Sequence, residues 1–230
     1  MDIYNRPIIG TLGEKTLHNE IKHLFCADET KHEIKVGSYV ADIKTDYGII
    51  EIQTGAFNKL RKKLTVFLED TLVTLVYPLP DTKWLLWINE QTGEVTKKRK
   101  SPKKGSIYDA VFELYKIKPF LSHKNLRLCI IFADIEEYRF LNGWSKDRKK
   151  GSSRHNRIPV KINGKVYFNF AKDYLQFIPE NIPENFTTKD LKTAAKINMR
   201  TSQTLLNILH HIGTVKRVGK SGNLLIYEKN

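Results

Sequence analysis

Two short alternating segments constrain the fold of this chain most strongly. Residues 40–55 read VADIKTDYGIIEIQTG, with apolar side chains at alternate positions on both sides of an Asp-Tyr-Gly turn. Alternation with a period of two is typical of β-strands, and the turn residues between the segments predict a hairpin. If the two strands pair in register, Asp42 and Glu51 point to the same side of the hairpin and Gln53 shares it. The other side is then apolar, with Ala41, Ile43, Ile50 and Ile52.

Two carboxylates on one side of a half-buried hairpin repel each other unless a cation lies between them. A divalent metal ion is the simplest such cation. Because the donors are carboxylate oxygens and no Cys or His cluster accompanies them, we expect Mg²⁺ or Mn²⁺ rather than zinc. A surface hairpin with one wet polar face would show the same alternation, and this alternative stays open.

The segments around the hairpin predict an α/β fold. An amphipathic helix over residues 14–25 precedes it, and a basic amphipathic helix over residues 56–70 follows. A buried strand over residues 72–79, which ends at prolines, is followed by an outer hairpin, a helix and a second buried strand. The composition changes near residue 179, where two prolines interrupt the periodic pattern, so we predict two domains, residues 1–178 and 179–230.

The last 45 or so residues predict two helices and two short strands. Thr187 and Asn198 are suited to begin the helices, and Gly213 to end the second. In pattern and length, this segment resembles the winged helix-turn-helix family. The resemblance implies that the second helix lies in a DNA major groove, with the two strands on the backbone. The residues that would contact DNA are Arg200, Thr201, Gln203, Thr204, Lys216, Arg217 and Lys220. Packing of this unit on a protein, such as a dimer partner, is the alternative.

The chain is strongly basic, with 39 Lys and Arg against 25 Asp and Glu and a formal net charge of +14. Much of the excess lies in two runs, which we expect to neutralise nucleic acid phosphates. The residues concerned are Lys97, Lys98, Arg99 and Lys100 in the first run, and Arg148, Lys149, Lys150 and Arg154 in a Gly/Ser-rich loop. Solvated loops are the alternative. No apolar run approaches the roughly 20 residues of a membrane span and no signal sequence is visible, so we expect a cytoplasmic protein without a membrane partner.

A helix with Glu20, then Asp42, then Glu51-Ile52-Gln53 resembles the PD-(D/E)XK nuclease superfamily, in particular its Holliday-junction-resolvase-like branch. The resemblance covers about residues 10–80. It implies a restriction-endonuclease-like mixed sheet flanked by helices, with a metal ion held by Asp42, Glu51 and the carbonyl of Ile52. It also implies that Glu20 supports a metal-bound water or a second metal. Gln53 departs from the family pattern, which usually has lysine there and so supplies a positive charge that glutamine cannot.

These observations together predict a DNA endonuclease that uses a metal ion to hydrolyse phosphodiester bonds. The catalytic residues would be Glu20, Asp42, Glu51 and Gln53. The basic residues expected close to the cleaved strand are Lys59, Arg61, Lys62 and Lys63. A homodimer is expected if the protein cuts both strands or resolves junctions, because each needs two active sites. The alternatives are a catalytically inactive, nuclease-derived DNA-binding or regulatory protein, for which Gln53 is the main argument, and an RNA-processing nuclease.

Overall fold

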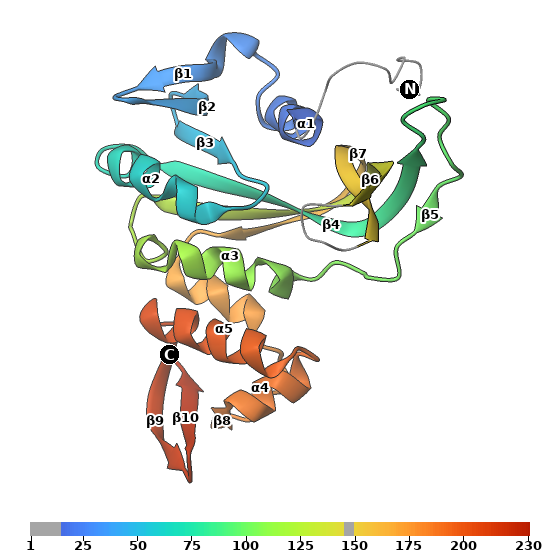
Figure 1. Ribbon diagram of the computed structural model, residues 1–230. Coiled ribbons are helices and arrows are strands. Elements are labelled where there is room, and N and C mark those ends of the chain that lie inside the picture. The colour runs from blue at the N-terminus through green and yellow to red at the C-terminus, as the bar shows by residue number, and fades with distance from the viewer. Residues whose placement is uncertain (1–14, 145–149) are drawn as a thin grey trace.

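The computed structural model describes residues 15–144 and 150–230. Its largest feature is a seven-stranded sheet in the order β1-β2-β3-β4-β6-β7, with β5 paired to β4 (Figure 1). The strands are β1 (His32–Val36), β2 (Tyr39–Thr45), β3 (Gly48–Ile52), β4 (Val73–Ile88), β5 (Arg99–Lys100), β6 (Leu126–Trp144) and β7 (Lys150–Phe168). β3, β4 and β6 are parallel and their other neighbours antiparallel, so the sheet is mixed. The predicted α/β class is confirmed.

Helices cover both faces of the sheet because each face carries its own apolar side chains. α1 (Lys15–Phe25) lies on one face, over a cluster that includes Leu17, Ile21, Ile43 and Ile52. The short helices η2 (Phe57–Leu60), α2 (Arg61–Phe67) and α3 (Val111–Lys116) lie on the other face. Figure 1 shows α1 above the long strands and α3 below them. The side chains of β3 therefore point alternately toward α1 and toward α2.

β4 is much longer than the strand over residues 72–79 that the sequence predicts. The expectation that this strand ends at its prolines is wrong, because β4 continues through Pro78 and Pro80. Proline lacks a backbone N–H and so cannot donate to a neighbouring strand. Because β3 ends opposite Val76, no residue of β3 lies beside Pro78 and Pro80 to accept such a hydrogen bond. A register shift between Pro80 and Lys83 then takes up the irregularity. The predicted basic loop is also partly wrong, since residues from Lys150 onward belong to β7.

The C-terminal segment forms a smaller unit with a three-stranded sheet in the order β8-β10-β9. Its elements are β8 (Phe186–Thr187), α4 (Thr188–Ala194), α5 (Met199–His211), β9 (Val215–Ser221) and β10 (Leu224–Lys229). The predicted helix starts are confirmed, because the Thr187 side chain accepts from the backbone of α4 and Asn198 accepts from the backbone of α5.

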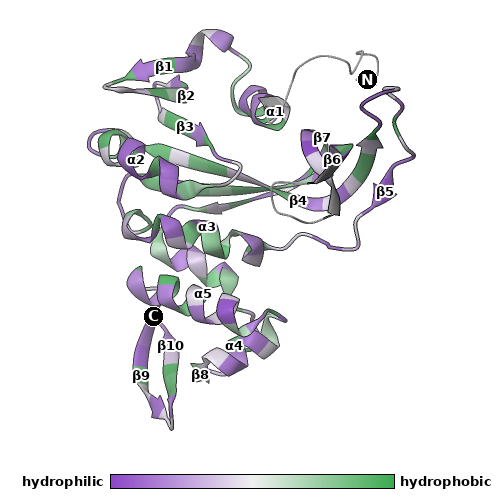
Figure 2. Ribbon diagram, in the orientation of Figure 1, coloured by the Kyte–Doolittle hydropathy of each residue, from purple (hydrophilic) through white to green (hydrophobic). Residues whose placement is uncertain are grey.

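One apolar cluster runs from the α2 and α3 face of the sheet into this unit, where it includes Leu205, Leu206 and Ile208 of α5. The boundary at residues 178 and 179 therefore does not coincide with a break in the buried core. Figure 2 shows hydrophilic colouring along β5 and β9, which lie at the margins of the molecule. Among the helices of the described ranges, none combines the length and the apolar content of a transmembrane span.

Gly48 closes the β2–β3 turn and offers a test of this packing. Its φ is +130°, and a Cβ there would lie 2.3 Å from the carbonyl oxygen of Leu72. We expect Gly48→Ala to lower the free energy of unfolding by about 3 kcal/mol or more, since backbone strain adds to a clash with another strand. Gly222→Ala is the matched control, because its φ is +57° but nothing lies within 4 Å. Urea unfolding should show a loss of about 1 kcal/mol for the control. Equal losses for both variants would contradict the close approach of Gly48 to Leu72.

Candidate active site

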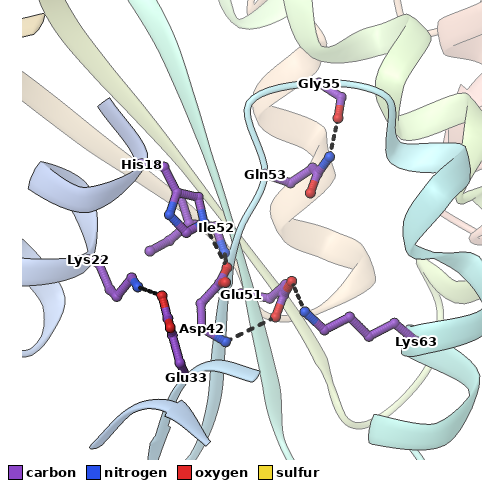
Figure 3. Close-up of polar contacts among 9 residues, drawn as sticks. All are labelled: His18, Lys22, Glu33, Asp42, Glu51, Ile52, Gln53, Gly55 and Lys63. Carbon is purple, nitrogen blue, oxygen red and sulfur yellow. Dashed lines mark hydrogen bonds and ion pairs between the residues drawn. The ribbon is translucent and has the colours of Figure 1, made fainter. Parts of the chain in front are cut away.

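Asp42 and Glu51 meet where β2 and β3 separate. The antiparallel register pairs Ile43 with Ile50, so the next position brings Asp42 opposite Glu51. The backbone N–H of Asp42 donates to Oε2 of Glu51 over 3.4 Å (Figure 3). Their side chains are 17% and 4% exposed, respectively. The Asp42 backbone and the Glu51 carboxylate are thus neighbours, although the basic groups that reach the two carboxylates come from α1 and α2, on opposite faces of the sheet.

Just beyond the last β2–β3 pair, the side chain of Asp42 accepts the hydrogen bond that a backbone carbonyl would accept in a continuous ladder. Oδ2 of Asp42 accepts a hydrogen bond from the backbone N–H of Ile52 over 2.7 Å. In a continuous antiparallel ladder, a carbonyl of the opposite strand would accept from such a group. The β2–β3 register ends before this point, whereas β2 continues to pair with β1 as far as Tyr39. The carboxylate therefore satisfies the end of β3 while β2 turns away.

Basic side chains from both helical layers neutralise these acids. Lys63 of α2 forms a close ion pair with Oε1 of Glu51, and Nε2 of His18 in α1 lies 3.1 Å from Oδ2 of Asp42. Beside them, the buried Lys22 of α1 donates to Glu33 over 3.0 Å (Figure 3). Glu33 has a φ of +54°, a left-handed conformation that is uncommon for glutamate. Each acid of the hairpin is thus matched by a cation or imidazole from the helix that covers its side.

Burial and charge move the pKa values of the two carboxyls in opposite directions. Burial, reinforced by the charge of Asp42, raises the pKa of Glu51 to about 7, because these effects exceed the opposing effect of Lys63. Burial also acts to raise the pKa of Asp42, but the hydrogen bond and charge of His18 and the N–H of Ile52 outweigh it and leave this pKa below its ordinary value. The pair therefore holds a proton more readily on Glu51 than on Asp42.

His18 is a site residue that the sequence reasoning did not identify. In a helix each residue is rotated by about 100° from the last, so His18 and Lys22 form one stripe beside the buried stripe of Leu17 and Ile21. This polar stripe beside an apolar one is the signal that could have revealed it. The same rotation bears on Glu20, which the resemblance implies to support a metal-bound water or a second metal. Glu20 is exposed and lies about 200° around the helix from His18, so it projects away from Asp42.

Gln53 and Ile52 occupy the end of β3. The side-chain amide of Gln53 donates to the carbonyl of Gly55 in the turn that leads to α2 (Figure 3). Gln53 is therefore bonded to its own turn. The backbone N–H of Gln53 donates to Val76, and Ile52 is buried against α1.

The predicted DNA-contacting residues are distributed over several elements of the fold. Lys59, Arg61 and Lys62 are exposed around the start of α2, whereas Lys63 is turned inward to Glu51. The residues of the first basic run, Lys97, Lys98, Arg99 and Lys100, are exposed beside β4 and on β5. The ammonium groups of Lys98 and Lys100 lie 5.3 and 5.9 Å from the ring centroid of Trp84.

In the second basic run, Arg154 lies on β7, and its Nε is 3.6 Å from Oε2 of the buried Glu137. Lys150 begins that strand. Arg148 and Lys149 lie outside the described residues. The expectation that Arg154 belongs to a loop is therefore wrong, because pairing of β7 with β6 extends through this segment.

Of the four residues of α5 that were predicted to contact DNA, Thr201 is buried. Thr201 is only 6% exposed, and its backbone N–H and hydroxyl both bond to the Asn198 side chain. The expectation that Thr201 faces outward is wrong, since it lies one turn before the buried Leu205 on the same side of the helix.

The remaining three positions on α5 are at least partly open. Arg200 and Gln203 are exposed, and the half-buried Thr204 donates its hydroxyl to the carbonyl of Arg200. The Arg200 guanidinium lies over the ring of Phe112 in α3, 5.1 Å from its centroid. In the strand pair that follows, Lys216, Arg217 and Lys220 are all exposed on β9.

The donor set at Asp42 and Glu51 suits a small, hard cation. In residues 15–144 and 150–230, no three His, Cys, Asp or Glu side chains form a metal-binding group. A centre here would consist of the two carboxylates and the Ile52 carbonyl, which lies beyond the last β2–β3 pair. Oxygen donors of this kind fit Mg²⁺ or Mn²⁺. A metal ion on Oε1 of Glu51 would compete with the ammonium group of Lys63.

Comparison with known proteins places this site within a family. The family described as "Domain of unknown function (DUF8091)" matches residues 15–169, about two thirds of the chain. The chain belongs to the DUF8091 family. The match runs from the start of α1 to just past the end of β7 and includes every residue of the candidate site.

An "Uncharacterized protein" of Treponema pallidum (strain Nichols) is 27% identical to this chain over 229 residues. The match covers 96% of this chain and 87% of the Treponema protein. No solved structure matches the chain.

The raised pKa of Glu51 predicts that this site lowers stability. A carboxyl whose pKa is higher in the folded than in the unfolded state favours folding when protonated, so its contribution is lost as pH rises from about 4.5 to about 7. We expect Glu51→Gln, in the presence of EDTA, to have a higher free energy of unfolding than the wild type above pH 7, by about 1–3 kcal/mol. The difference should shrink toward pH 4.5. Denaturant unfolding at several pH values measures it, and a variant less stable than the wild type at pH 8 would contradict the account.

Proposed function

We propose that this protein is a divalent-metal-dependent endonuclease that hydrolyses phosphodiester bonds in DNA, with its active site at Asp42 and Glu51. The observation that carries the proposal is the proximity of the buried Glu51 to the partly buried Asp42 at the end of β3. Two acids that interact away from water destabilise a fold, as the raised pKa of Glu51 indicates, and such an arrangement is typical of a functional site.

The layout around the acids also supports the proposal. A helix, three antiparallel strands, a helix and then a strand parallel to the third follow in this order along the chain. This order agrees with the resemblance to the PD-(D/E)XK superfamily and its restriction-endonuclease-like sheet. The order β8, α4, α5, β9 and β10 likewise agrees with a winged helix. Exposed basic residues on η2 and α2, on β5 and on β9 supply surfaces for a DNA backbone.

The residues of the site have distinct roles in this proposal. A Mg²⁺ or Mn²⁺ ion held by Asp42, Glu51 and the Ile52 carbonyl would supply charge stabilisation and an acidified water at neutral pH. The Ile52 N–H fixes the orientation of Asp42, and His18 supports the same carboxylate from α1. Gln53, two residues after Glu51, would orient a water or donate to a phosphate only if its amide left Gly55.

A nuclease-derived DNA-binding or regulatory protein is the second candidate. It is favoured by Gln53, which is neutral and bonded to Gly55, and by the neutralisation of Glu51 by Lys63. Metal-dependent cleavage distinguishes the two candidates, and competition between DNA and RNA substrates tests the RNA-processing alternative. A protein that binds DNA tightly but cleaves no substrate with Mg²⁺ or Mn²⁺ would favour the regulator.

Substitution of the two acids tests the catalytic assignment. We expect Asp42→Asn and Glu51→Gln each to reduce Mn²⁺-dependent cleavage of plasmid and branched DNA by at least about 100-fold, because each removes a negatively charged ligand. Glu20→Gln is the matched control on a neighbouring element. It should cleave at close to the wild-type rate, since Glu20 faces away from the site. Cleavage that persists in both acid variants would exclude this active site.

The basic run beside β4 provides a separate test of DNA binding. We expect simultaneous replacement of Lys97, Lys98, Arg99 and Lys100 by alanine to reduce the slope of log affinity against log salt by about 2–4, since each lost phosphate contact removes about 0.9. Fluorescence anisotropy with a labelled duplex in EDTA measures the slope. The control replaces four exposed lysines elsewhere, Lys35, Lys124, Lys172 and Lys192. An equal decrease for the control would show that net charge, not this surface, sets the affinity.

A further inference from the structure

We propose that Lys63 supplies the positive charge that Gln53 lacks, and that in the metal-free protein its ammonium group occupies the position of the metal ion on Glu51. When Asp42 and Glu51 hold a metal ion, Lys63 would leave Glu51 and its ammonium group would contact the phosphate that is cleaved. The inference rests on the proposed function of the same site and adds a residue and a conformational step to it.

The contacts of Glu51 show that Lys63 and a metal ion compete for one oxygen atom. Oε2 of Glu51 already accepts from the backbone N–H of Asp42, while Oε1 is bound by the ammonium group of Lys63. The two side chains of this ion pair are 18% and 4% exposed, so the pair is held largely away from water. A cation that binds Oε1 competes with the ammonium group for the electron density of this oxygen, and two cations on one oxygen atom repel each other. Metal binding therefore weakens the Lys63 contact.

The charge of the site requires a further cation once substrate is present. Asp42 and Glu51 together carry −2 when ionised, a divalent metal brings the sum to zero, and a phosphodiester returns it to −1. Gln53 is neutral, and its amide is bonded to Gly55. An uncompensated charge at a poorly hydrated site is costly, and more negative charge develops as the phosphodiester reacts. Lys63, at +1, restores neutrality without any other change.

Lys63 is placed to remain nearby after it leaves Glu51. It is the third residue of α2, which follows the Gly55 turn through η2, so its backbone is fixed close to the end of β3. Its ammonium group also lies 5.5 Å from the ring centroid of the buried Phe67, one turn further along α2. This contact holds the side chain near the site, while its flexible four-carbon stem permits movement of the charge.

Other lysines near the hairpin do not combine these properties. Lys44 and Lys59 are close to Glu51 in the sequence, but both are exposed. Lys22 is buried in its ion pair with Glu33. Lys62 precedes Lys63 on the same helix but is exposed. Figure 3 shows Lys63 reaching Glu51 from the side opposite to α1.

Mn²⁺ affinity measured without DNA tests the competition directly. Isothermal titration of the wild type, Lys63→Met and Lys62→Met compares two variants that lose the same charge from adjacent positions of α2. We expect Lys63→Met to bind Mn²⁺ about tenfold or more tightly than the wild type, because no buried ion pair has to be broken. The Lys62→Met affinity should equal that of the wild type. At saturating Mn²⁺, Lys63→Met should nevertheless cleave DNA about 100-fold more slowly, and Lys63→Arg should restore part of the rate.

The result for Lys63→Met separates this inference from the proposed function. Mn²⁺ affinity equal to or weaker than that of the wild type, or cleavage at the wild-type rate, would overturn the role of Lys63 and leave the metal site intact. If neither the wild type nor any variant binds Mn²⁺, or if Asp42→Asn binds and cleaves normally, the proposed function itself fails.

A second measurement does not depend on how well Lys63→Met folds. The lysines of the wild-type protein can be labelled by reductive ¹³C-methylation, and the Lys63 signal is assigned by its absence in Lys63→Arg. Addition of Mg²⁺ should shift this signal, because the ammonium group leaves Glu51, while the Lys62 signal should stay in place. Mg²⁺ binding with an unchanged Lys63 signal would overturn the inference.

Discussion

The hydrogen bond from the Ile52 N–H to the Asp42 carboxylate is the contact on which the candidate site depends. It ends the pairing of β2 with β3 without leaving a buried backbone donor unsatisfied, and such a group would otherwise cost about 1–3 kcal/mol. In this hydrogen bond the Asp42 carboxylate replaces a backbone carbonyl of the opposite strand, and it holds Asp42 beside Glu51. A small or apolar residue at position 42 would leave the end of β3 without this partner.

The surrounding layers determine how strongly these acids interact. α1 and α2 cover opposite faces of the sheet, and each contributes one basic group, His18 and Lys63, to one acid. Because Glu51 is nearly inaccessible, the apolar clusters that stabilise the sheet also make its charge unfavourable. The fold thus stores an unfavourable arrangement at the end of a short parallel strand, and binding of a divalent cation would relieve it.

Periodicity predicted the elements that carry the site, because Ile43, Ile49 and Ile52 must be buried whatever the rest of the chain does. It failed where a long-range partner decides the outcome. Pro78 and Pro80 are compatible with a continuous β4 only because β3 ends beside them, and sequence does not reveal where a neighbouring strand ends. His18 gains its importance from Asp42, 24 residues away. Glu20 was favoured by its residue type, although the rotation of the helix directs it away from the site.

The most direct test of the account is the position of a bound metal ion. Crystals grown with Mn²⁺ and measured at a wavelength where manganese scatters anomalously would locate it without assumptions about the ligands. The account predicts an anomalous peak within about 2.0–2.3 Å of oxygen atoms of both Asp42 and Glu51, with the Lys63 ammonium group no longer on Glu51. A peak elsewhere, or an occupied Lys63–Glu51 ion pair in crystals saturated with Mn²⁺, would contradict it.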